Sequence, residues 1–127
     1  MVGFALALLL AGAAAPDSPA GPPLPAEASG LPGGWRIGHD GEGARTCDIR
    51  LRSSAVIGGY RLTLAKRCTK AVDRASELYS WRPAPGGKIA LADATRQTVY
   101  LFHPLVGPVW ASEGPEDTRY LMIRKPR

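Results

Sequence analysis

The sequence predicts an all-β protein: a small antiparallel up-and-down barrel of eight short strands that follows an extended N-terminal arm. Three observations favour this fold class. Apolar and polar residues alternate with a period of two in short runs between residues 35 and 124. Glycine- and proline-rich turn signals separate these runs. The only two cysteines both lie in the first half of the same region, where a disulfide could staple the strands.

The strands are expected at residues 35–37, 47–51, 60–64, 78–82, 88–92, 98–103, 109–112 and 119–124. In the run 47–51 the apolar residues alternate with Asp48 and Arg50, which is typical of a half-buried strand. Neighbours in sequence usually pair, and closing the sheet removes its exposed edges. A meander that closes on itself is therefore the simplest arrangement of these strands.

The turns between the strands have their own signals. Gly58-Gly59 predicts a tight hairpin, and the proline-containing stretches 83–87 and 104–108 predict breaks between strands. The polar stretch 68–75 is typical of a turn with one turn of helix.

The N-terminus has the pattern of a secretion signal. An apolar run from Val2 to Leu10 is followed by small residues up to Ala14, as signal peptidase requires. We expect residues 1–14 to be this signal, with the mature chain starting at Ala14 or Ala15. The run is too short to span a bilayer, which takes ~20 apolar residues. The alternative is a buried N-terminal strand or helix.

The formal net charge is +5, and the basic residues are scattered along the chain. A nucleic-acid site would need a concentrated basic face, so nucleic acid is not the expected partner. A solvated basic surface can instead steer the protein toward an acidic partner, and it then changes the association rate more than the affinity.

Cys47 and Cys68 are predicted to form a disulfide, because paired cysteines in an exported chain are usually oxidised. A metal site is not expected, since His39 and His103 have no ligand spacing with the cysteines or with each other. The carboxylates fall mostly in turns or on predicted solvent faces, and no serine lies in a nucleophile elbow. The sequence therefore predicts neither an enzyme nor a cofactor.

Residues 15–33 form a separate segment before the barrel domain at 34–127. Six prolines lie between residues 16 and 32. Because proline fixes φ and supplies no N–H, the segment is expected to be an extended arm with one short turn around residues 26–29. It is either a leader without a role of its own or an arm that inserts into a partner.

From about residue 24 to residue 125 the chain resembles the bacterial alkaline-proteinase inhibitor family, which also includes a brucella outer-membrane lipoprotein. The residues that carry the resemblance, in the order and spacing of that family, are Leu24-Pro25, Gly34-Trp35, Cys47-Asp48-Ile49, Tyr60-Arg61-Leu62, Cys68, Trp81-Arg82-Pro83, Ile89-Ala90-Leu91-Ala92-Asp93 and Val99-Tyr100-Leu101-Phe102.

The resemblance implies a lipocalin-like barrel with one disulfide. It implies a periplasmic or secreted monomer that inhibits a secreted serralysin-type zinc metallopeptidase. The N-terminal trunk of the family enters the protease cleft beside the zinc, which belongs to the protease, and the barrel packs on the rim of the cleft. The expected protease contacts are Ser18, Pro19, Ala20, Gly21, Pro22, Pro23, Leu24 and Trp35. Trp35 is equally expected in the core, and Trp81 and Trp110 are expected in the core or at the barrel ends.

Two other functions stay open. Eight-stranded barrels can carry one small ligand, although this chain has only two Phe and we expect its interior to be filled by its own side chains. The chain could also be a module of the cell envelope that inhibits nothing.

Overall fold

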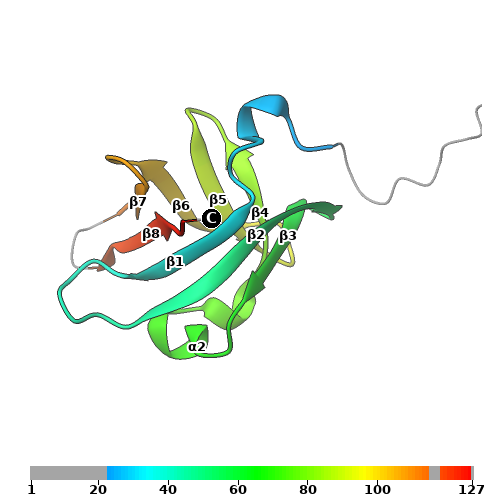
Figure 1. Ribbon diagram of the computed structural model, residues 1–127. Coiled ribbons are helices and arrows are strands. Elements are labelled where there is room, and N and C mark those ends of the chain that lie inside the picture. Colours follow the sequence, from blue (N-terminus) through cyan, green and yellow to red (C-terminus); the bar gives the residue numbers. More distant parts are fainter. Residues whose placement is uncertain (1–22, 115–117, 127) are drawn as a thin grey trace, which may run out of the picture.

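Eight antiparallel strands form one closed barrel in the computed structural model, which describes residues 23–114 and 118–126 (Figure 1). Each strand pairs with the next along the chain, and the last pairs with the first. The strands are β1 (Gly33–His39), β2 (Thr46–Val56), β3 (Gly59–Leu64), β4 (Leu78–Ala84), β5 (Lys88–Asp93), β6 (Thr98–Pro104), β7 (Val109–Ser112) and β8 (Tyr120–Arg124). The predicted all-β up-and-down barrel is confirmed, and each predicted run overlaps one strand.

Several strands run further than the sequence pattern predicts, and β1, β2 and β4 do so by two residues or more. β2 continues through the exposed residues 52–54, and its register with β3 shifts between Leu51 and Ala55. An irregularity of this kind hides the period of two. β4 continues through Pro83 because β3 pairs with β4 only at Tyr60 and Arg61. Pro83 therefore lies where one neighbouring strand has ended, and proline is tolerated at such an edge.

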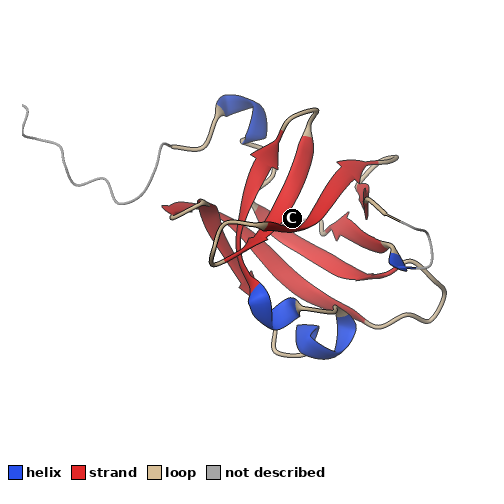
Figure 2. Cartoon of the chain, turned by 180° about the vertical axis from the view of Figure 1, so that it is seen from behind, coloured by secondary structure: helices blue, strands red, loops and turns tan. Residues whose placement is uncertain are grey.

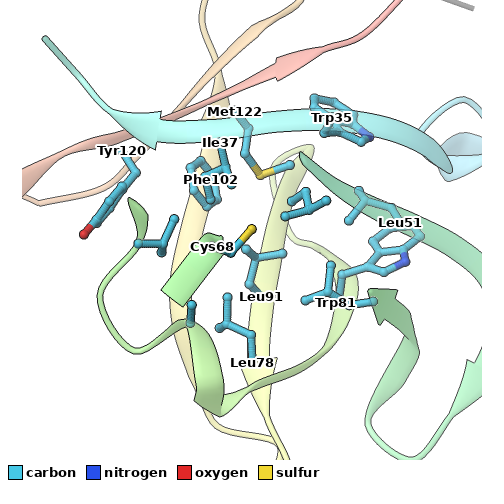
Figure 3. Packing of buried hydrophobic residues seen from close by; sticks show 14 of the residues in the cluster. Trp35, Ile37, Leu51, Cys68, Leu78, Trp81, Leu91, Phe102, Tyr120 and Met122 are labelled. Atoms are coloured by element: carbon cyan, nitrogen blue, oxygen red, sulfur yellow. The ribbon is translucent and has the colours of Figure 1, made fainter. Parts of the chain in front are cut away.

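The interior of the barrel is filled by the inward-facing side chains of the strands (Figure 3). The largest of them, each at most 1% exposed, are Trp35, Ile37, Leu51, Trp81, Ile89, Leu91, Phe102 and Met122. Trp110 is half-buried and meets Trp35 edge to face, with 5.9 Å between the ring centres. Trp35 and Trp81 thus lie in the core, Trp110 packs against it without being fully buried, and the filled interior disfavours a carrier of small ligands.

The lower end of the barrel in Figure 1 is covered by the helix α2 (Cys68–Ala71) and the 3-10 turn η2 (Ala75–Glu77). The predicted disulfide between Cys47 and Cys68 is confirmed, and it ties α2 to β2. The backbone N–H of Asp73 donates to the Tyr120 hydroxyl at 3.0 Å, and the Tyr100 hydroxyl donates to the Asp73 carbonyl at 2.6 Å. Burial raises the pKa of Tyr100, so this donor stays protonated.

Candidate functional site

Residues 23–32, which we call the arm base, cross the upper end of the barrel in Figure 1. They contain the 3-10 turn η1 (Ala26–Ala28), at the position where the sequence predicts a short turn. Figure 2 shows η1 at the opposite end of the barrel from α2. Ala28 is buried, and Leu24 and Leu31 pack against the core. The arm base is therefore part of the folded domain, because its apolar residues cover the barrel end.

Arg124, at the end of β8, holds the arm base through backbone carbonyls. Its Nη1 donates to the carbonyls of Gly30 and Leu31, the latter at 3.3 Å, and its Nη2 donates to the carbonyl of Pro32 at 3.1 Å. The same guanidinium lies 5.2 Å from the ring centre of Trp35, within the range of a cation–π contact. One side chain thus joins the last strand to the segment that precedes the first.

Gly33 makes this approach possible. Its φ of +141° is one that L side chains rarely adopt, and a Cβ there would lie 3.2 Å from Nη2 of Arg124. Glycine at this position therefore lets the chain turn from the arm base into β1 directly beside the guanidinium.

Trp35 also positions the arm base, but from inside the barrel. Its side chain is 1% exposed, and its indole N–H donates to the Leu31 carbonyl at 3.0 Å. Of the two expectations for Trp35, contact or core, the structure places the side chain in the core. Such a residue can act on a partner only through the arm that it positions.

Tyr60 of β3 marks the point where the described part of the arm begins. Its hydroxyl donates to the Pro23 carbonyl at 3.2 Å, and its ring centre lies 5.4 Å from that of the buried Trp81. Pro23 is exposed and Leu24 is half-buried. The structure thus brings two of the predicted contacts to the barrel end, beside β3.

The other predicted contacts, Ser18, Pro19, Ala20, Gly21 and Pro22, lie outside the described residues, as does the predicted signal at 1–14.

The C-terminal residues hold the beginning of β1, which directly follows the arm base. The backbone N–H of Lys125 donates to the Gly34 carbonyl at 3.1 Å, and its ammonium lies 3.3 Å from the Asp48 carboxylate. The hydrogen bond from Lys125 lowers the pKa of Asp48, and the charge of Arg36 adds to the effect. The carboxylate is therefore ionised at neutral pH, and it links β1, β2 and the C-terminal end.

Sequence reasoning missed Arg124 and Tyr60 as the residues that hold the arm. One signal was present for Arg124, which shares the inward-facing parity of Tyr120 and Met122 on β8. A charged residue at an inward position near a strand end indicates a polar partner at the barrel mouth. The sequence gives no such signal for Tyr60, because a tyrosine at an inward position of a strand is typical of an ordinary core residue.

The described residues offer contacts rather than a reactive group. In this part of the chain no group of three His, Cys, Asp or Glu residues could hold a metal ion. A search of the same residues for a helix long and apolar enough to cross a membrane finds none. Hydrogen bonds from Arg124, Trp35 and Tyr60 position the arm base at the barrel end, and this arrangement suits recognition of another protein.

A family model described as "Protease inhibitor Inh" matches residues 25–125. The match begins inside the arm base and includes all eight strands and both cysteines. No curated protein matches the chain significantly.

Proposed function

Because the chain belongs to the Inh protease inhibitor family, we propose that it inhibits a secreted serralysin-type zinc metallopeptidase from the periplasm. In this proposal the arm before Pro23 enters the active-site cleft, and the barrel packs against the rim. The contacts in the cleft come from residues 18–22, and Pro23 and Leu24 contact the protease where the arm leaves the barrel end. The family is one of inhibitors, so the chain acts by occupying a protease and not by catalysis.

The observation that carries the proposal is the way the arm base is held. Arg124 and Trp35 bind its carbonyls at one end, and Tyr60 binds the Pro23 carbonyl at the other. A peptide whose base is already ordered loses less conformational entropy when it binds. The proposed arm therefore starts from a fixed point.

The composition of the arm supports occupation without cleavage. Prolines recur through residues 16–25, and proline fixes φ and has no N–H to offer to a protease strand. Such a composition favours an extended conformation and gives poor geometry at a scissile bond. Zinc in the complex would be the zinc of the protease.

A titration tests this target class. We expect the mature chain to inhibit a serralysin-type metallopeptidase stoichiometrically, because an ordered arm base and a rigid barrel favour tight association. A subtilisin-type serine protease, assayed with the same casein substrate, is the control and should keep its activity. Equal inhibition of both enzymes, or inhibition of neither, would contradict the proposal.

A further inference from the structure

A groove of about 770 Å³ lies beside the point where the described arm begins. Three segments form its walls: the arm base, the hairpin between β2 and β3, and the end of β4. Tyr60 lines the groove and also donates to the Pro23 carbonyl. The groove and the start of the arm therefore share a wall.

The walls are mostly apolar, and one aliphatic side chain stands open to solvent. Ile57, at the tip of the hairpin, is 64% exposed, and Val56, Pro83 and Pro85 line the groove with it. An exposed isoleucine gains little on folding, but it contributes to binding when a partner removes it from water. Next to a pre-formed groove it has the character of an interface residue.

The groove is built from stiff parts. Gly58 adopts φ +89° at the hairpin tip, and a Cβ there would lie 2.6 Å from Cγ of Arg96, so the turn fits closely against its neighbour. Pro83 and Pro85, which also line the groove, have fixed φ angles. Little ordering is needed when such a groove receives a partner, which favours binding.

Arg82 and Glu27 are the charged residues of the lining, and a second arginine lies beside it. Arg82 lines it and donates to the Thr98 hydroxyl at 2.7 Å. Among the described residues, no ion pair includes Arg82. Glu27 is the one acidic residue of the described lining, and Arg96 lies against the hairpin tip. This arrangement fits an apolar side chain that has a carboxylate next to it.

We propose that this groove is a second docking site for the protease, and that it receives an apolar side chain flanked by an acidic residue from the rim of the cleft. The inference rests on the proposed function. Pro25 and Glu27 of the arm base form part of the groove wall. A protease that takes the arm into its cleft must therefore approach this groove, and Ile57 is the residue that it covers first.

Single substitutions in the full mature chain test the groove. Ile57→Ser is expected to raise the inhibition constant for a serralysin-type metallopeptidase by about tenfold or more, because a buried isoleucine contact is lost. Ile57→Val keeps most of the apolar surface and should stay within about threefold of the wild type. Val106→Ser is the matched control. Val106 is an aliphatic residue, 76% exposed, on the hairpin between β6 and β7 across the barrel, and its loss should change the constant less than twofold by the same reasoning.

The outcomes separate the groove from the arm. If the wild type inhibits the protease and Ile57→Ser leaves the inhibition constant unchanged, the groove is not a docking site. The proposed function is then unaffected. Equal weakening by Ile57→Ser and Val106→Ser also overturns it, since the contact is then not specific to the groove. If Ile57→Ser changes only self-association in sedimentation velocity, the groove belongs to a second copy of the chain. Absence of inhibition by the wild type removes the proposed function, and the groove inference with it.

Discussion

Replacement of Trp81 by alanine is expected to lower the free energy of unfolding by about 3–5 kcal/mol. The indole is 0% exposed, and its N–H donates to the Arg52 carbonyl at 2.9 Å. Alanine leaves a cavity at the centre of the barrel and removes the donor from that carbonyl. The loss is a large share of the total stability of a domain of this size, which is typically about 5–15 kcal/mol.

Urea unfolding monitored by far-UV circular dichroism measures this loss. Tyr79→Ala is the matched control, because Tyr79 is the neighbouring residue on β4 and its side chain is 45% exposed. The control is expected to change the stability by about 0.5 kcal/mol or less. Similar losses for the two variants would contradict the position of Trp81 in the core.

Loss of the disulfide is expected to cost about 3 kcal/mol by loop entropy. The bond joins Cys47 on β2 to Cys68 on α2, and both residues are buried. Without it, the segment that covers the lower end of the barrel keeps its packing, the two tyrosine hydrogen bonds to Asp73 and the hydrogen bond from Arg67 to the Thr46 carbonyl. The double variant Cys47→Ala/Cys68→Ala should still fold, because the other core residues are unchanged.

Thermal unfolding with and without reductant tests the disulfide. The midpoint of the double variant should lie about 10–20 °C below that of the oxidised wild type. Reductant should lower the wild type to the level of the double variant and leave the double variant unchanged. A wild type whose midpoint does not respond to complete reduction would show that the disulfide adds nothing to stability.

The strands could be predicted from sequence because each has one face toward solvent and one face toward the core. In the stretch 47–51, the apolar residues are buried and Asp48 and Arg50 are exposed, as the alternation predicts. Where the face pattern breaks, the prediction fails. β2 continues through the exposed residues 52–54, where its register with β3 shifts and the alternation of apolar and polar residues is lost. Pro83 remains in β4 because the neighbouring strand β3 does not pair with β4 at that position.

The arm base shows what a local pattern cannot supply. Its prolines, which fix φ, predict an extended segment with one short turn. The structure has that turn as η1. The contacts that fix it come from far along the chain, since Arg124 follows Leu31 by 93 positions and Tyr60 follows Pro23 by 37. Every residue type has a backbone carbonyl that can accept a hydrogen bond. The sequence of the arm base therefore does not show which side chains bind it.

The most direct test of inhibition by the arm compares the chain that starts at Ala15 with the chain that starts at Pro23. The shorter chain keeps Leu24, Leu31 and their contacts with the barrel, so both chains should unfold at the same midpoint. Against a serralysin-type metallopeptidase, the longer chain should inhibit and the shorter one should be weaker by at least about 100-fold, because the contacts in the cleft are gone. Equal inhibition by the two folded chains would contradict the arm mechanism and would place the inhibitory site on the barrel.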